Sequence, residues 1–79
     1  MWYVYALKAE ERNYIYVGLT NNLERRIYEH NSGYNKTTKP YAPFSLIYSK
    51  EFETRPLARI HEKEMKTSTG KRFLRSLME

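Results

Sequence analysis

The first seven residues constrain the fold of this chain more than any other segment. From Trp2 to Leu7 every side chain is aromatic or aliphatic, so both faces of an extended backbone there are apolar. A strand of this kind is stable only when both of its faces are covered, which predicts a central strand with a layer on each side. The six-residue run is too short for a secretory segment or a membrane span, so we expect a cytoplasmic protein.

Two further elements follow this strand closely. A polar stretch, residues 8–13, separates it from a second β-like run over 14–20, and this spacing predicts an antiparallel pair. At Asn22 the apolar pattern changes to the period of a helix. We therefore expect a helix over 22–31, which ends at the Asn31-Ser32-Gly33 stop signal.

The second half of the chain predicts a loop, a third strand and two more helices. Residues 34–43 contain two prolines and are expected to form a loop, and residues 44–52 again resemble a strand. Thr54 is placed to cap a second helix that extends to about Gly70, and a short last helix is expected around residues 73–78. The order β-β-α-β-α-α predicts a small α/β (α+β) fold, with a three-stranded, mainly antiparallel sheet flanked by helices.

Composition narrows the functions that remain. With 79 residues, we expect a single domain over 1–79, and without cysteine it has no disulfides, thiolate catalysis, zinc fingers or iron–sulfur clusters. All nine acidic residues are glutamate, which argues against the aspartate-rich clusters that hold two catalytic metals and leaves a one-metal site open. The net charge of +5 favours a polyanionic partner such as nucleic acid.

Much of this positive charge lies near the C-terminus. Two acids accompany seven basic residues in that region: Arg55, Arg59, Lys63, Lys66, Lys71, Arg72 and Arg75. One interpretation is a solvated helix face, and the other is a surface that faces phosphates.

The first predicted helix carries two candidate functional side chains. Arg26 and His30 share the stripe by which two aliphatic residues face the sheet, whereas Arg25 and Glu29 are expected to point away from it. A guanidinium at the edge of the core needs a hydrogen-bonding or charged partner there. Alternatively, Arg26 can extend past the apolar surface to water. His30 has an equally simple alternative as a hydrogen-bonded histidine at a helix C-terminus.

The predicted strand pair carries two tyrosines of interest. Tyr5 and Tyr16 can direct their hydroxyls to the sheet edge where the arginine arrives, or they can simply pack in the core. Gly18 permits a close approach of backbone or ligand, and a bend in the strand explains it equally well.

One carboxylate in the second predicted helix has small or apolar neighbours. Glu62 follows Ala58 by one helical turn and precedes Met65 on the same face, so it is a candidate metal ligand. The alternative is an ion pair with Lys66 or Arg59 on the same helix.

Taken together, these residues resemble the GIY-YIG nuclease domain, and in particular its short stand-alone bacterial members. The resemblance covers essentially the whole chain. It is carried by Tyr3-Val4-Tyr5, Tyr16-Val17-Gly18, Asn22-Leu23-Glu24-Arg25-Arg26, Glu29-His30-Asn31, and the helical pair Ala58 and Glu62.

The resemblance implies an endonuclease that cuts phosphodiester bonds in DNA with one Mg²⁺ or Mn²⁺ ion. Tyr16 would be the general base, and Tyr5 would position it or share its proton. Arg26 would stabilise charge on the phosphoryl oxygens, and His30 would lie near the scissile phosphate. Glu62 would hold the metal.

The same resemblance guides the expected partners. We expect DNA, with RNA left open, to contact four basic residues: Arg25, Arg59, Lys63 and Lys66. The small size favours a substrate selected by its structure or damage, as in DNA repair, and leaves room for a protein partner that supplies specificity. The alternative is a binding module for nucleic acid that keeps the scaffold without catalysis.

Overall fold

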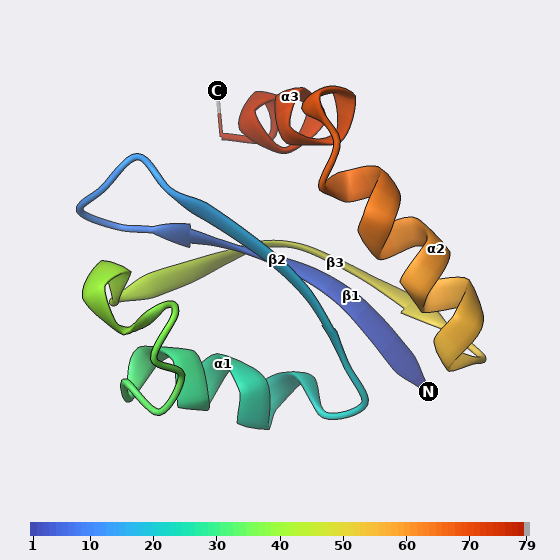
Figure 1. Ribbon diagram of the computed structural model, residues 1–79, viewed down its shortest axis with the longest axis horizontal. Coiled ribbons are helices and arrows are strands. Elements are labelled where there is room, and N and C mark those ends of the chain that lie inside the picture. The colour runs from blue at the N-terminus through green and yellow to red at the C-terminus, as the bar shows by residue number, and fades with distance from the viewer. Residues whose placement is uncertain (79) are drawn as a thin grey trace.

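Three strands form one antiparallel sheet at the centre of the molecule. The structure, a computed structural model, describes residues 1–78. The strands β1 (Trp2–Ala9), β2 (Ile15–Thr20) and β3 (Phe44–Phe52) lie in the order β2-β1-β3 (Figure 1). Both neighbours of β1 run antiparallel to it. The first strand is therefore central, as its two apolar faces predict.

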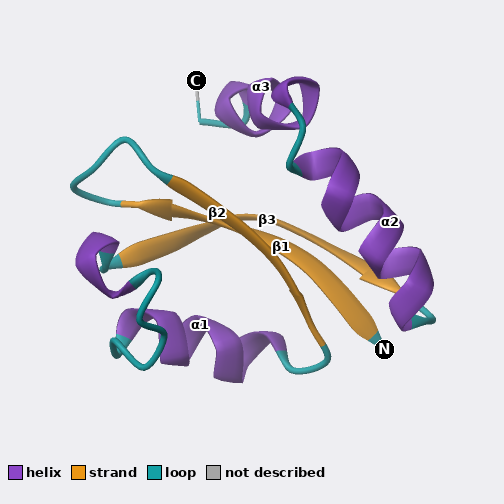
Figure 2. Ribbon diagram, viewed as in Figure 1, coloured by secondary structure: helices purple, strands orange, loops and turns teal. Residues whose placement is uncertain are grey.

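Helices cover both faces of this sheet. In Figure 2, α1 (Leu23–Asn31) lies on one side, and α2 (Arg55–Met65) and α3 (Ser68–Ser76) lie on the other. A 3₁₀ turn, η1 (Lys39–Tyr41), occurs within the predicted loop before β3. The predicted fold, a three-stranded sheet flanked by helices in the order β-β-α-β-α-α, is confirmed. Within residues 1–78, no helix is long and apolar enough to cross a membrane.

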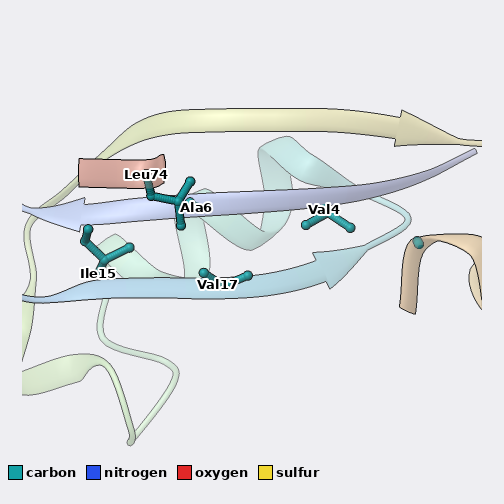
Figure 3. Packing of buried hydrophobic residues seen from close by; sticks show 6 residues of the cluster. Val4, Ala6, Ile15, Val17 and Leu74 are labelled. Carbon is teal, nitrogen blue, oxygen red and sulfur yellow. The ribbon is translucent and has the colours of Figure 1, made fainter. Parts of the chain in front are cut away.

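Alternate residues of the strands feed two separate cores. The core beneath α2 and α3, shown in Figure 3, contains Val4, Ala6, Ile15, Val17, Ala58 and Leu74. The core beneath α1 contains Tyr5, Leu7, Ala9 and Phe44. Because successive strand residues point to opposite faces, position in the strand decides which core a side chain joins. Tyr5 therefore points to the α1 side of the sheet.

The predicted helix signals act as expected at three places. The side chain of Asn22 accepts a hydrogen bond from the Arg25 amide at 3.1 Å and so caps α1. Thr54 caps α2 in the same way. Gly33 adopts a φ of 80° just after α1, a conformation that glycine takes at little cost. The first strand, however, continues past Leu7 to Ala9, which pairs with Phe44.

The predicted end of the second helix is wrong. This helix was expected to continue to about Gly70, but α2 ends at Met65 and α3 begins at Ser68. Thr67 explains the break, because its side chain accepts a hydrogen bond from the Gly70 amide at 3.1 Å and caps a new helix. Gly70 lies against the backbone of Glu64 and Met65, where a Cβ atom would collide. It is therefore a packing glycine at the start of α3.

Candidate active site

Tyr5 lies at the centre of the α1 face of the sheet. Its side chain is fully buried, and its hydroxyl lies 2.9 Å from Nε2 of His30. Gly18 is directly opposite Tyr5 on β2, and a Cβ atom there would come within 2.7 Å of the Tyr5 hydroxyl and 2.9 Å of the Tyr16 ring. Gly18 therefore serves a close approach, but the approaching groups are the side chains of these two tyrosines and not the backbone or ligand that the sequence interpretation named.

His30 is hydrogen-bonded at both ring nitrogens. Its Nδ1 lies 2.8 Å from Oγ1 of Thr38, and the Thr38 hydroxyl donates to the carbonyl oxygen of Asn35 at 3.4 Å. Burial, together with the charge of Arg26, lowers the pKa of His30 despite Glu29 nearby. A neutral His30 with its proton on Nδ1 satisfies the whole series, because Tyr5 then donates to Nε2 and His30 donates to Thr38.

Thr38 was not identified from the sequence. It belongs to the proline-containing segment between α1 and β3, which has no periodicity, yet its side chain is fully buried. Only the folded contact with His30 reveals its importance.

Tyr16 is the more accessible of the two tyrosines. It is half-buried, with its ring centroid 4.7 Å from that of His30 and 6.1 Å from that of Tyr5. Burial, reinforced by the neighbouring Tyr16, raises the pKa of Tyr5 to about 12, although Arg26 acts in the opposite direction. Tyr5 is therefore a protonated hydrogen-bond donor at neutral pH.

Arg26 reaches the edge of this cluster and finds a partner there. Its Nη1 donates to Oε1 of Glu29 at 3.0 Å, and both side chains are 30% exposed. Glu29, expected to point away from the sheet, is half-buried and pairs with Arg26, because residues three apart on a helix are neighbours and the partly buried guanidinium attracts the carboxylate. Burial alone would lower the pKa of Arg26, but Tyr5 and Glu29 outweigh this effect and raise it.

An open hollow borders the arginine. It has a volume of about 200 Å³ and is lined by Arg26, Glu29, Tyr34 and Asn35. Tyr34 and Asn35 come from the segment after α1, which the sequence indicated only as a loop. The hollow gives a ligand access to the guanidinium.

Glu62 lies apart from the cluster of Tyr5, Tyr16, Arg26 and His30. It follows Ala58 of the opposite core by one helical turn, and its side chain is buried on the α2 side of the sheet. Its Oε1 accepts a hydrogen bond from Nη1 of Arg59 at 2.8 Å, and its Oε2 forms an ion pair with Nζ of Lys66 at 3.1 Å. The predicted ion-pair alternative is thus observed with both candidate partners.

The predicted nucleic-acid contacts are likewise divided between the two sides. Arg25 is exposed on α1, whereas Arg59 and Lys63 are exposed on α2 and Lys66 is exposed at its C-terminal cap. Arg59 and Lys66 retain side-chain exposures of 53% and 50% while they pair with Glu62. The four predicted contact residues therefore lie on two different sides of the sheet.

The surroundings of Glu62 do not fit a resident divalent metal ion in this arrangement. A metal-binding carboxylate needs free oxygen lone pairs, but both Glu62 oxygens face a cation. Among residues 1–78, no three side chains of histidine, aspartate, glutamate or cysteine converge as a metal site. The metal role of Glu62 stays a prediction.

The chain matches the family model of the GIY-YIG catalytic domain over residues 1–75. It belongs to the GIY-YIG family. A UPF0213 protein of Staphylococcus haemolyticus is 37% identical over 78 residues, which cover 98% of this chain and 94% of the relative. A UPF0213 protein of Clostridium perfringens is 41% identical over 70 residues, or 87% and 74% of the two chains.

A solved structure agrees with this assignment. The solution NMR structure of a UPF0213 protein from Bacillus halodurans is 34% identical, with a TM-score of 0.57, and the match covers 98% of this chain and 85% of that one. The chain thus resembles short GIY-YIG proteins along its length. GIY-YIG domains are nucleases, which act on nucleic acids.

The register of the hairpin explains why the two GIY-YIG motifs work as one unit. Tyr3, Val4 and Tyr5 on β1 pair in order with Thr20, Leu19 and Gly18 on β2. The glycine that ends the second motif therefore faces the tyrosine that ends the first. The close approach at Gly18 brings the two tyrosine rings together.

Proposed function

We propose that this GIY-YIG chain is an endonuclease that hydrolyses phosphodiester bonds in DNA. The observation that carries the proposal is the cluster of Tyr5, Tyr16, Arg26 and His30 on one face of the sheet, beside an open hollow. The cluster combines an accessible phenol, a charged guanidinium and a fixed hydrogen-bond network. Phosphodiester hydrolysis needs a general base and groups that stabilise charge on the phosphoryl oxygens, and this cluster can supply both.

Tyr16 acts in this proposal as the general base. A phenol has an ordinary pKa near 10, so it accepts a proton from water at neutral pH only where cations favour the phenolate. Arg26 is the cation that this proposal assigns to that task, and its guanidinium borders the hollow. Once a phosphate is bound, Arg26 also stabilises the charge that develops on the phosphoryl oxygens.

Tyr5 and His30 act as positioning residues. Tyr5 keeps its proton, because its pKa is about 12, and donates it to His30 in a hydrogen bond. His30 is in turn fixed by Thr38. The neutral imidazole lies against the Tyr16 ring and holds the base at the edge of the site. Sharing of a proton between the two tyrosines is not needed for this scheme.

We keep one Mg²⁺ or Mn²⁺ ion as a proposed requirement but derive no step through it. Glu62 can offer its carboxylate to a metal only after Arg59 or Lys66 releases an oxygen. We further propose that the structure or damage of the DNA selects the substrate, as in repair in the cytoplasm, because so small a domain cannot read a long sequence. A protein partner would add specificity.

The test is incubation of the purified chain with single-stranded, duplex, flap and four-way DNA, with Mg²⁺, Mn²⁺ or chelator. Cleavage that needs metal is expected, and Tyr16→Phe and Arg26→Ala should abolish it while circular dichroism stays unchanged. Tyr48→Phe is the matched control, because it removes a tyrosine hydroxyl from the opposite face of the sheet. Full activity of both active-site variants would refute the assignment. Glu62→Gln tests the metal role separately.

The ion pairs of Glu62 favour one alternative, a nucleic-acid-binding module without catalysis. If the carboxylate only pairs with Arg59 and Lys66, it holds no metal, and Lys63 remains exposed on α2 for contact with phosphate. This alternative predicts binding to DNA that weakens steeply with salt, because counterions are released on binding. It also predicts no metal-dependent product on any of the four substrates.

A further inference from the structure

Two exposed tyrosines lie together beside the hollow. Tyr28, near the end of α1, is 62% exposed, and Tyr34, just after this helix, is 72% exposed. Their ring centroids are 6.3 Å apart, with the planes tilted by 49°. Single exposed apolar residues are common on protein surfaces. Here two aromatic rings are adjacent, and the ring of Tyr34, which lines the hollow, offers a planar ligand a face for stacking.

The hollow beside this platform has the size and rigidity of a small binding site. Its volume of about 200 Å³ is several times the roughly 30 Å³ that one water molecule occupies in the liquid, so a single planar ring fits. Backbone contacts hold its wall in place. The Tyr34 amide donates to the Glu29 carbonyl at 3.1 Å, and Oδ1 of Asn35 accepts from the Thr37 amide at 2.9 Å.

The polar groups of the hollow match the edge of a nucleobase. One oxygen of Glu29 accepts from Arg26, and the other carboxylate oxygen can accept from an amino group. The side-chain NH₂ of Asn35 can donate to a ring nitrogen or carbonyl. The negative charge of Glu29 disfavours a phosphate inside the hollow. The hollow therefore suits the base of a nucleotide and not its phosphate.

The surrounding charge suits the backbone of the same ligand. Residues 31–43 contain Lys36 and Lys39 and no acidic residue. Both lysines are in the same segment as Tyr34. They can contact the phosphates of a strand whose base occupies the hollow. Bases inside a duplex are stacked on each other, so only an unpaired nucleotide can offer a free ring face to a tyrosine.

We propose that Tyr34, with Tyr28 beside it, stacks an unpaired nucleobase that carries an exocyclic amino group, and that Glu29 accepts from this amino group. The site takes cytosine, adenine or guanine in preference to thymine. It rests on the proposed function in one respect, because it places this nucleotide next to the phosphate that Arg26 would contact. Binding itself can be measured without cleavage.

The test is fluorescence anisotropy in chelator with labelled twelve-nucleotide strands of deoxycytidine or thymidine and with a duplex of equal length. Stacking on an aromatic side chain contributes about 1–3 kcal/mol per base, so Tyr34→Ala should weaken binding of the cytosine strand about 5- to 150-fold. Tyr34→Phe keeps the ring face and should retain binding. Duplex binding should be the same for all these proteins.

Phe73→Ala provides the matched control, because Phe73 is an exposed aromatic residue of α3, on the other side of the sheet. It should leave single-strand binding unchanged. The proposal is overturned if wild-type protein does not bind single strands, or if Tyr34→Ala leaves this binding unchanged or weakens duplex binding equally. Equal affinity for cytosine and thymidine strands would overturn the role of Glu29.

This design separates the two proposals. Tyr34-dependent binding without metal-dependent cleavage would support the base site and refute the nuclease. Cleavage that needs Tyr16 and Arg26, with binding that ignores Tyr34, would support the nuclease and refute the base site.

Discussion

Two tyrosine–histidine hydrogen bonds, one on each face of the sheet, provide an internal comparison. The Tyr5 hydroxyl lies 2.9 Å from Nε2 of His30, and both side chains are fully buried. The Tyr48 hydroxyl lies 2.7 Å from Nε2 of His61, whose side chain is 17% exposed. Substitution of either tyrosine by phenylalanine removes the same atom and leaves the ring in place. The two variants therefore differ in how well water can replace the lost partner.

The expected costs follow from this difference in burial. In Tyr5→Phe, Nε2 of His30 loses its partner in a site closed to water, and an unsatisfied buried group costs about 1–3 kcal/mol. In Tyr48→Phe, water can reach His61, so the loss is nearer the net value of one hydrogen bond, about 0.5–1.5 kcal/mol. Each kcal/mol shifts the Tm of so small a domain by about 4–8 °C. Tyr5→Phe should thus have the clearly lower Tm.

Urea unfolding at neutral pH, followed by the fluorescence of Trp2, the single tryptophan of the chain, measures both costs. The free energy of unfolding should fall by about 1 kcal/mol more for Tyr5→Phe than for Tyr48→Phe. An equal or larger loss for Tyr48→Phe would refute the reasoning. It would mean that water reaches His30 or that the Tyr5 hydrogen bond contributes little.

Three further predictions concern the same site and its surroundings. Gly18→Ala should lower the free energy of unfolding in urea by about 1–3 kcal/mol, because its Cβ would meet two tyrosines; an unchanged value would contradict the close packing. Burial lowers the pKa of His30, so below about pH 6.5 the unfolded chain binds more protons than the folded one and stability falls. The free energy of unfolding should fall by up to about 1.4 kcal/mol per pH unit, and by less in His30→Gln. The same pH dependence in both proteins would contradict this prediction. Glu62→Gln should cost less than about 1 kcal/mol in the same assay, because Arg59 and Lys66 are half-exposed; a larger loss would make the carboxylate a structural anchor.

Local signals were sufficient to predict most of the fold. The two-sided apolar character of residues 2–7 identified the central strand, and Asn22 and Thr54 marked helix starts correctly because capping depends on immediate neighbours. The prediction ended this helix at Gly70, but Thr67 caps a new helix three residues earlier. Gly70 has its role only through contact with the backbone of Glu64 and Met65, which the sequence alone does not place beside it.

The candidate site was predictable where it follows from periodicity. Helical spacing placed Arg26 and His30 on the stripe that faces the sheet, and the structure brings both to the tyrosines. Contacts that depend on tertiary structure were not predictable. Glu29 turns toward Arg26 because the guanidinium is partly buried, and Thr38 reaches His30 because the segment after α1 folds back over the helix end.

The position of Glu62 raises two separate questions: on which face of the sheet hydrolysis takes place, and whether Glu62 takes part in it. The family resemblance places all these residues in one site. Tyr16 faces the α1 side of the sheet, whereas Glu62 is buried on the α2 side, held between two half-exposed cations. Those cations cannot neutralise the carboxylate and bind phosphate at full strength at once, so the predicted roles of Arg59, Lys66 and Glu62 depend on each other. Loss of cleavage in Tyr16→Phe alone would locate the chemistry on the α1 face without this carboxylate. Loss in Glu62→Gln as well would require that DNA first draws the cations away from it.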